Sequence, residues 1–464
     1  MTIWQPDLGD KSGPKYILIA EAIGEGIAQG TLKERDRMPV QRDLAYWLGL
    51  SLNTVSRAYA EAIRRGYLQG EVGRGTYVRR TGPIPVQQVQ AGMARSSSGP
   101  IDFTLNLPAA GEGAAALAKS LETLQGSQSL AAYLDYQTEV EAPRHAEAAA
   151  AWLRNLGLDI ENDGVILTNG AQHGLLVSLL ATARPGDVLL TETMTYGPIK
   201  AMARHLGLKL RPLAMDDGGL SPAALDAACR ESAAKVLYCL PTLQTPTTIT
   251  MTEARRHEIA AIAKKHELLI IEDDVFGFLP PERPAPLACH APDNTVFLTS
   301  TSKCLAPGLR VGFLYAPPRL RRPLRAAVNL SCWMPPPLMA EIASSWIIDG
   351  TADKLNQFQR SEAQARQEMA RRILAGHDVR ADPHGFHLWL SLPQHWWAES
   401  FRAAAERQGV KVLTGETFVI NQAKAPNAIR LCLSHEPSRA RVSRGLEIIA
   451  GLLDETGDAG GLVV

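Results

Sequence analysis

Net charge, long apolar runs and paired cysteines are all missing from this sequence of 464 residues. Forty-eight basic residues balance 48 acidic residues, so the overall charge gives no sign of nucleic-acid binding, and any such site must be local. No apolar run is long enough to span a bilayer and no secretory leader opens the chain, so we expect a soluble cytoplasmic protein. The six cysteines include no CxxC pair and fit no zinc spacing, which predicts free thiols in a reducing compartment and no metal site.

The chain is long enough for two or three domains, and 45% of its residues are apolar, which is sufficient for sizeable cores. Two dissimilar regions are joined by the stretch RTGPIPVQQVQAGMARSSSGP, which is rich in Pro, Gln, Ser and Gly and has no sustained periodicity. That composition is typical of a linker. We therefore predict an N-terminal domain over residues 1–80, a linker over 81–104 and a C-terminal region over 105–464.

Three short helices and a hairpin are predicted within residues 1–80. Pro14 begins an amphipathic segment that Gly30 ends, Pro39 begins a second segment, and Ser51 caps a third. The segment YLQGEVGRGTYV then places two short extended pieces around a glycine-rich tip, which predicts a β-hairpin. Two helices joined by a tight glycine turn and followed by a hairpin indicate a winged helix-turn-helix.

Local charge agrees with DNA binding by this region. Residues 35–80 contain nine arginines and four acidic residues, a net charge of +5. The third helix is expected to enter the major groove through its N-terminal residues, while arginines meet phosphates or the minor groove. The alternative is a small helical domain with a solvated basic face, and the predicted hairpin weighs against it. The predicted DNA contacts are Arg42, Ser51, Asn53, Thr54, Arg57, Arg74, Gly75 and Thr76.

The same residues carry a family resemblance. The region resembles the GntR-type DNA-binding domain along MPVQRDLAYWLGLSLNTVSRAYAEAIRRGYLQGEVGRGTYV. Two positions depart from that pattern. Val40 stands where a small hydroxyl residue is usual, and Leu52 stands where an arginine is common, which removes one potential base or phosphate contact.

From about residue 160, short apolar runs alternate with amphipathic helical segments. The runs are GVILT, DVLLTE, KVLYCL, ELLIIEDD and TVFLTS. This alternation predicts an α/β fold, in which a mostly parallel sheet has helices on both faces. The pattern loosens after about residue 330, which predicts a smaller α+β part. We place the large part at about 140–330 and the small part at about 331–464.

Polar residues follow the ends of these predicted strands, where sites lie in such sheets. The amides of Ala171 and Gln172 open a helix, which suits a phosphate. Tyr196 follows the next run, Glu272–Asp274 ends a buried run, and Thr299–Lys303 ends another. Each feature alone has an ordinary explanation, such as a turn glycine, a core tyrosine or a surface lysine. Their common placement favours one site.

The residue types at these strand ends predict a pyridoxal 5′-phosphate site. A phosphate cradle, an aromatic ring for stacking, a carboxylate for a ring nitrogen and a lysine amine are the groups that this cofactor needs. The lysine forms a Schiff base with the cofactor aldehyde. The carboxylate keeps the pyridine nitrogen protonated, so that the ring withdraws electrons.

A second resemblance supports this hypothesis. The stretch STSKCLAPGLRVG matches the cofactor-lysine motif of the fold-type I aminotransferases, and residues 105–464 resemble that family. Asp273 is preferred over Asp274 because the family places an aromatic residue three positions later. The resemblance implies Lys303 as the Schiff-base lysine, Asp273 at the ring nitrogen, Tyr196 on the ring, Ala171, Gln172, Ser300 and Arg310 at the phosphate, Arg430 at an effector carboxylate, and Tyr136 at the phosphate of the partner subunit.

Two positions depart from the aminotransferase pattern at one cofactor atom, the phenolic O3′. The segment LQTPTT has Thr245 where the family has an asparagine donor, and DDVF has Phe276 where the family has a tyrosine donor. Thr245 partly replaces the asparagine as a donor, but Phe276 has no hydroxyl. We therefore expect the cofactor to bind and transamination to be weak or absent, because transamination also requires a proton transfer by the released lysine.

A GntR-type domain, a linker and an aminotransferase-like region in one chain resemble the MocR subfamily of bacterial transcription regulators. The resemblance implies a head-to-tail homodimer in which each DNA-binding domain lies over the partner's large domain. The leading hypothesis is a regulator that binds a double-stranded DNA operator and senses an amino compound by external aldimine formation at Lys303. The alternative is an active aminotransferase that carries a DNA-binding module. A third possibility, a regulator that has lost the cofactor, conflicts with the presence of Lys303, Asp273 and Arg310.

Overall fold

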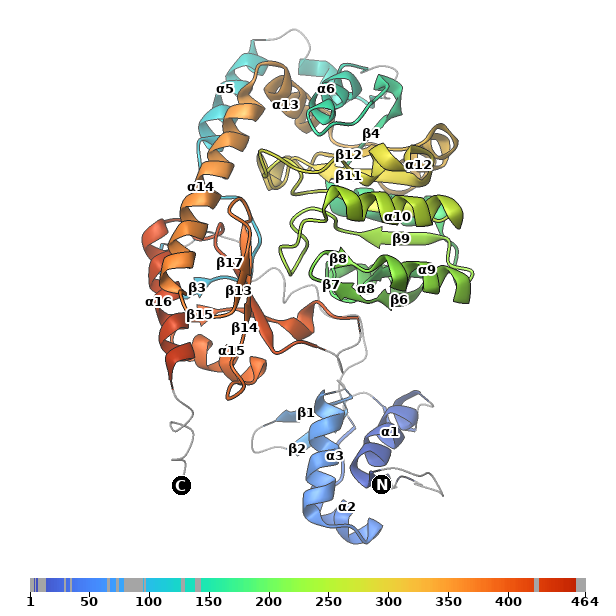
Figure 1. Ribbon diagram of the computed structural model, residues 1–464, viewed down its shortest axis with the longest axis vertical. Coiled ribbons are helices and arrows are strands. Elements are labelled where there is room, and N and C mark those ends of the chain that lie inside the picture. The colour runs from blue at the N-terminus through green and yellow to red at the C-terminus, as the bar shows by residue number, and fades with distance from the viewer. Residues whose placement is uncertain are drawn as a thin grey trace. The chain divides into compact units, whose positions relative to one another are not determined.

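The computed structural model describes residues 4, 6, 14–28, 31–33, 36–64, 67–71, 75–78, 95, 97–126, 130–137, 143–420 and 425–455 (Figure 1). The chain divides into two compact units, Met1–Met93 and Ala94–Val464. Among these residues, no helix has the length and apolar character needed to cross a membrane.

The first unit is a helix-turn-helix followed by a two-stranded wing. Its elements are α1 (Lys15–Ala28), α2 (Gln41–Leu48), α3 (Leu52–Arg64), β1 (Leu68–Glu71) and β2 (Gly75–Val78). Gly49 ends α2 with a φ of 63°, a left-handed conformation that costs glycine little. The amide of Thr54 donates to Oγ of Ser51 at 3.1 Å, so Ser51 caps α3 as expected.

Side-chain contacts fix the turn between α2 and α3. The Tyr59 hydroxyl donates to the carbonyl of Pro39 at 2.7 Å, and the Ser56 hydroxyl donates to Oε1 of Gln41 at 2.7 Å. Leu68 and Val78 bring the wing into the same apolar core as the helices. That core contains Ile19, Ala20, Ile23, Leu44, Val55, Ala58, Tyr59 and Ala62.

The described residues of the second unit form a seven-stranded sheet in the order β4-β12-β11-β10-β9-β5-β6. Strand β12 is antiparallel to both of its neighbours, and the remaining pairs are parallel, as predicted. The strands are β4 (Val165–Thr168), β5 (Val188–Glu192), β6 (Lys209–Leu213), β9 (Val236–Cys239), β10 (Leu269–Asp273), β11 (Thr295–Ser300) and β12 (Gly312–Tyr315). A short hairpin, β7 (Met215–Asp216) and β8 (Gly219–Leu220), follows β6.

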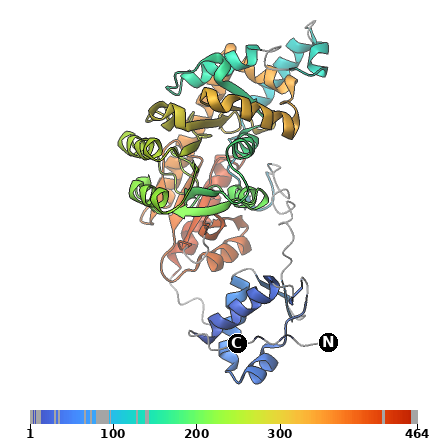
Figure 2. The ribbon, with the colours of Figure 1, turned by 90° about the vertical axis from the view of Figure 1, so that its right-hand side faces the viewer.

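Helices cover both faces of this sheet (Figure 2). Successive strand residues point to opposite faces, so Ile271 and Ile270 belong to separate apolar clusters, each with its own set of helices. This is why the strands read as continuous apolar runs. The helices are α5 (Gly113–Gln125), α6 (Pro143–Arg154), α7 (Ala171–Thr182), α8 (Pro198–His205), α9 (Pro222–Glu231), α10 (Glu253–Lys265), α11 (Leu287–His290), α12 (Pro318–Cys332) and α13 (Pro337–Ile348).

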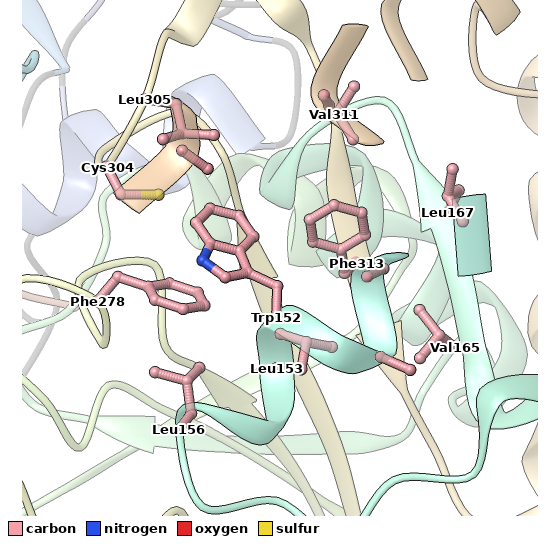
Figure 3. Packing of buried hydrophobic residues seen from close by; sticks show 14 of the residues in the cluster. Trp152, Leu153, Leu156, Val165, Leu167, Phe278, Cys304, Leu305, Val311 and Phe313 are labelled. Atoms are coloured by element: carbon pink, nitrogen blue, oxygen red, sulfur yellow. The ribbon is translucent and has the colours of Figure 1, made fainter. Parts of the chain in front are cut away.

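Trp152 of α6 lies at the centre of a third apolar cluster (Figure 3). Its ring stacks on Phe278 with centroids 4.2 Å apart and meets the edge of Phe313 at 6.3 Å. Cys304 and Leu305, the two residues that follow Lys303, are buried in the same cluster. Close packing in this cluster therefore holds the backbone next to Lys303.

The small part is an antiparallel four-stranded sheet in the order β13-β14-β17-β16, as far as the described residues extend. The long helix α14 precedes this sheet, and α16 packs against α14. The elements are α14 (Thr351–Ile373), β13 (Val379–Ala381), β14 (His387–Ser391), α15 (Ala398–Arg407), β15 (Val410–Lys411), β16 (Leu413–Thr414), β17 (Ala428–Cys432) and α16 (Arg439–Asp454).

One strand of the small part lies inside the range predicted as linker. Strand β3 (Ile101–Asp102) pairs in parallel with β15, more than 300 residues away, and the second unit begins at Ala94 rather than at 105. The amide of Phe103 donates to the carbonyl of Lys411 at 2.9 Å. Phe103 is fully buried, and its ring lies so close to Gly445 of α16 that an added Cβ there would be 2.6 Å from the ring.

We predict that Phe103→Ala destabilises the second unit by about 3–5 kcal/mol, because it leaves a cavity between β3 and α16. Calorimetric unfolding of the full chain measures the shift of the second unit's transition. Trp397→Ala is the control, because Trp397 is 76% exposed, and it should change stability by less than about 0.5 kcal/mol. Equal effects of the two substitutions would contradict the anchoring role of Phe103.

Candidate functional site

A cavity of about 180 Å³ lies beyond the carboxyl ends of the central strands. It brings together residues that are far apart in the sequence. The predicted site residues that line it are Ala171, Gln172, Tyr196, Thr245, Asp273, Ser300, Lys303, Arg310 and Arg430. The cavity is also lined by residues to which the sequence analysis gave no cofactor-binding role, namely Asn106, Leu107, Leu175, Leu240, Val275, Phe276, Ser302 and Pro307.

Lys303 follows β11 and reaches into this cavity. Its Nζ donates to the carbonyl of Asn106 and lies 5.7 Å from the ring centroid of Phe276. Burial lowers the pKa of Lys303 to about 8, and the cations Arg430 and Arg310 act in the same direction. A substantial share of the amine is therefore neutral and nucleophilic near physiological pH.

The three acids that end β10 have three different environments. Glu272 accepts two backbone amides at the start of α11, both at 2.9 Å, and lies 3.5 Å from the buried Arg256. Asp274 pairs with Arg283. Asp273 lines the cavity. Neighbouring side chains along a strand point to opposite sides, so Glu272 and Asp274 find their partners away from the cavity and Asp273 faces it.

Asp273 has one occupied oxygen and one free oxygen. The hydroxyl of Tyr238 donates to Oδ2 at 2.7 Å, whereas the buried Oδ1 has no hydrogen-bond partner in the part of the chain that the structure describes. Burial raises the pKa of Asp273 to about 6, against the hydrogen bond from Tyr238. An N–H donor in the cavity would satisfy Oδ1 and favour the ionised carboxylate.

An anion-binding end is built around the start of α7. Gly170 precedes the helix with a φ of 80°, and an added Cβ there would lie 2.6 Å from the Arg310 guanidinium. Nη2 of Arg310 donates to the carbonyl of Asn169 at 2.9 Å. The free amides at the start of a helix and an adjacent guanidinium together attract phosphate. Ser300 lines the cavity at this end and accepts from the amide of Ser302 at 3.3 Å.

The remaining walls are aromatic or weakly polar. Burial raises the pKa of the Tyr196 hydroxyl to about 12, with Asp273 acting in the same direction. Thr245 is buried at the cavity edge. Phe276 packs edge-on against Phe386, with centroids 6.3 Å apart, and offers no hydroxyl at the position where the family has one.

Arg430 projects from β17 of the small part toward the same cavity. Its Nη2 donates to the carbonyl of Thr104 at 2.7 Å, and its Cζ lies 4.7 Å from the ring centroid of Phe418. Its buried Nε makes no hydrogen bond with any described residue. The guanidinium therefore retains donor capacity for an anion.

Sequence reasoning missed a set of hydrogen bonds behind Lys303. Nδ2 of Asn106 lies 3.1 Å from Nδ1 of His387, and Nε2 of His387 lies 3.2 Å from the carbonyl of Gln244. Burial lowers the pKa of His387 to about 3, and Arg430 lowers it further, so the ring is neutral. Nδ1 then accepts from Asn106 and Nε2 donates to Gln244. No local motif marks these residues, since their partners lie in distant segments.

Tyr136 lies apart from the other predicted residues within one chain. It lines a separate cavity of about 320 Å³, is 73% exposed, and its ring centroid is 5.7 Å from that of Trp333. Its predicted role concerns the partner subunit's site.

The predicted DNA contacts of the first unit that fall on described residues lie on α2, α3 and the wing. Arg42, Asn53 and Arg57 are exposed, and the Arg57 guanidinium lies 4.3 Å from the ring centroid of Tyr16. The hydroxyls of Ser51 and Thr54 are 2.8 Å apart, so both take part in the helix cap.

Two further predicted contacts, Gly75 and Thr76, begin β2. The carbonyl of Thr76 accepts from the amide of Met38 at 2.8 Å, which joins the wing to the segment before α2. Arg74 lies outside the described residues.

Comparison with known families agrees with this two-part structure. Residues 15–78 match the family described as "Bacterial regulatory proteins, gntR family", and residues 100–449 match "Aminotransferase class I and II". Similar structures include an archaeal alanine:glyoxylate aminotransferase, with a TM-score of 0.73, 22% identity and coverage of 86% of this chain and 99% of that one. At that identity the likeness concerns the fold.

Several relatives share both parts over nearly their whole length. An uncharacterized HTH-type transcriptional regulator of Bacillus subtilis, YdeF, is 27% identical over 97% of each chain. The vitamin B6 salvage pathway transcriptional repressor PtsJ of Salmonella typhimurium is 26% identical over 90% of this chain and 93% of its own. The HTH-type transcriptional regulator TauR of Rhodobacter capsulatus is 25% identical over 94% and 96%.

Fold, site and relatives together define a transcription regulator in which a DNA-binding domain is fused to an aminotransferase fold. More narrowly, the chain belongs to the aminotransferase class I and II family, and its additional GntR-type domain makes it a regulator of the MocR type. The fold implies pyridoxal 5′-phosphate as the cofactor. The residues present fit that group, because the free Oδ1 of Asp273, the anion-binding end at Arg310 and the amine of Lys303 all face one cavity.

The pKa of Lys303 gives a prediction for imine formation. Only the neutral amine attacks an aldehyde, and at pH 7.5 a pKa of about 8 leaves about one amine in four neutral, against about one in a thousand at the ordinary value. With added pyridoxal phosphate, the rate at which absorbance near about 420 nm appears should rise with pH and level off above about pH 8.

Lys303→Ala is the control and should remove the saturable phase of that reaction. A rate that keeps rising up to pH 10, as expected for an ordinary surface lysine, would contradict the lowered pKa.

Proposed function

We propose that this regulator binds an amino compound in the cavity that contains Lys303 and Arg430 and changes its affinity for DNA in response. One observation carries the proposal. Lys303 and Arg430 line the same cavity, and both donate to backbone carbonyls of the segment 104–106. Lys303 donates to the carbonyl of Asn106, and Arg430 donates to the carbonyl of Thr104. That segment follows the linker from the DNA-binding unit.

The cofactor-binding roles follow from the geometry of the cavity walls. When bound, pyridoxal phosphate supplies an aldehyde carbon that forms an imine with an amine and a ring that withdraws electrons. Oδ1 of Asp273, which has no partner among the described residues, would accept the ring N–H, and Tyr196, which lines the same cavity, would stack on the ring. The amides of Ala171 and Gln172, with Ser300 and Arg310, would hold the phosphate, and Thr245 would donate to the ring oxygen.

The effector class follows from Arg430. A guanidinium holds both oxygens of a carboxylate through parallel hydrogen bonds. The aromatic ring of Phe418 supports the guanidinium from one side. An effector that presents an amine to the Lys303 position and a carboxylate to Arg430 is an amino acid or a close relative.

Coupling to DNA follows from competition for the same donors. An effector carboxylate at Arg430 competes with the carbonyl of Thr104, and engagement of the Lys303 amine removes the contact with Asn106. The segment is otherwise tied to the small part, since Ser434 donates to Leu107 at 2.5 Å. A ligand that favours one position of this segment shifts the equilibrium between DNA-binding states by its difference in affinity.

We infer that turnover by transamination is not the physiological activity. Phe276 lines the cavity without a hydroxyl, and His387 is neutral and held by hydrogen bonds on both ring nitrogens. The alternative, an active aminotransferase with a DNA-binding module, requires steady conversion of amino donors in a coupled assay.

We further propose that the protein acts on DNA in the bacterial cytoplasm as a head-to-tail homodimer. Exposed apolar side chains line the 320 Å³ cavity or lie within two residues of its lining in the sequence, and Tyr136 would reach the partner subunit's site from here. An apolar patch of this kind marks an interaction surface. Its members are Leu134, Tyr136, Leu330 and Trp333, with exposures of 90%, 73%, 82% and 58%.

Spectra and DNA binding test the sensing proposal together. The purified chain, loaded with pyridoxal phosphate, is titrated with a panel of amino acids and simple amines while absorbance and anisotropy of a labelled duplex are recorded. The duplex is first selected from a random pool by the chain itself. We expect one class of carboxylate-bearing amines to shift the spectrum and to change DNA affinity by about 5- to 150-fold.

Two variants decide the outcome. Lys303→Ala should lose the spectral response and the coupling while retaining basal DNA binding, and Arg430→Gln should lose discrimination between amino acids and amines without a carboxylate. A spectral response with no change in DNA affinity would refute the coupling. A DNA response to the cofactor alone would replace the amino-compound proposal with a cofactor sensor.

Sedimentation tests the dimer. Leu330→Asp combined with Trp333→Asp should shift the chain toward monomer, because charges replace apolar contact area. Trp397→Asp is the matched control, since Trp397 is also exposed but lies on the small part. Equal sedimentation of both variants would place the interface elsewhere.

A further inference from the structure

A cluster of imidazole and carboxylate side chains lies on α10 and α11, outside the site described above. Glu253 and His257 occupy the first turns of α10, and His290 ends α11. Nε2 of His290 is 2.9 Å from Oε1 of Glu253, and Nε2 of His257 is 3.6 Å from the same oxygen. One ligand atom from each residue lies within 4.8 Å of the other two.

These separations match those between ligands on a single ion. Zinc binds histidine nitrogen and carboxylate oxygen at about 2.0–2.2 Å, so two ligands on one ion are about 3–3.5 Å apart. Two of the three pairs are already near this value. The third pair is His257 and His290. His257 is exposed, so its side chain has room to rotate and shorten that distance.

Part of the cluster is held in place by the fold. The other oxygen of Glu253 accepts the amide of Ala285 at 3.0 Å, and Thr252 caps the helix through the amide of Arg255 at 3.3 Å. The side chain of His290 is 11% exposed, and its Nε2 has no hydrogen bond of acceptable geometry to any residue that the structure describes. The two imidazole rings are tilted by 41° to each other, with centroids 4.0 Å apart.

We propose that Glu253, His257 and His290 bind a zinc ion, with solvent completing the coordination. Two imidazoles and one carboxylate form a donor set that suits zinc better than magnesium or calcium, which prefer oxygen ligands. The ordinary alternative is a His–Glu ion pair. That pair leaves Nε2 of His290 without a hydrogen bond of acceptable geometry and two imidazole rings next to each other, whereas an ion uses all three groups.

The position of the site gives it a structural consequence. The ion ties the start of α10 to the end of α11, while the start of α11 donates two amides to Glu272, next to Asp273. Zinc therefore stabilises the second unit at the helix that supports the acid-bearing strand end, and this effect is independent of the effector proposal.

Calorimetric titration of the chelator-treated full chain with zinc chloride tests the proposal. We expect one ion per chain and a higher unfolding temperature of the second unit. His257→Gln combined with His290→Gln should weaken zinc binding by at least about tenfold. Glu253→Gln serves as a second variant, because the amide oxygen still accepts from Ala285 but no longer offers a carboxylate.

Two controls exclude other zinc ligands. His205→Gln removes an exposed imidazole elsewhere, and Cys289→Ser removes the thiol next to His290, and neither should change the affinity. Unchanged affinity in the double histidine variant, or the absence of zinc binding by the wild-type chain, would overturn the proposal. Circular dichroism and the imine band of the loaded protein verify that each variant is folded.

Discussion

The burial of three consecutive acids at the end of β10 is the constraint around which the second unit is organised. A buried carboxylate is costly without a partner, so each acid requires its own. Glu272 uses the start of α11 and Arg256, Asp274 uses Arg283, and Asp273 uses Tyr238 with one oxygen and keeps the other for the cavity. The neighbouring strand β11 runs parallel to β10, so its end places Lys303 at the same cavity.

Burial acts on the two central ionisable groups in opposite senses. It lowers the pKa of Lys303 to about 8 and raises the pKa of Asp273 to about 6, so the same low-polarity cavity moves both toward their neutral forms. The neutral amine of Lys303 is nucleophilic, and an N–H donor bound in the cavity would favour the ionised form of Asp273. Both properties suit a site whose occupant is exchanged, which is the chemistry that a sensor needs.

The fold and most of the site were predictable because their signals are local. Apolar runs located the strands, helix caps such as Ser51 located the turns, and the residues around Lys303 carried a family motif. Strand β3 was read as linker because two residues beside Ser, Gly and Pro carry no periodicity, and its partner β15 lies more than 300 residues away. Asn106 and His387 were missed for the same reason, since each gains a role only from the other.

Residue type and order along the chain were enough to predict two dissimilar regions, polar side chains at the strand ends and Lys303 as the candidate for the cofactor lysine. The family resemblance favoured Asp273, but only the folded chain showed how Glu272 and Asp274 are paired away from the cavity, since neighbouring side chains of one strand point in opposite directions. Only the folded chain brought Arg430 and Lys303 onto the same short segment, and Glu253, His257 and His290 into one cluster. Contacts between distant segments depend on packing, and packing has no signature in a local stretch of sequence.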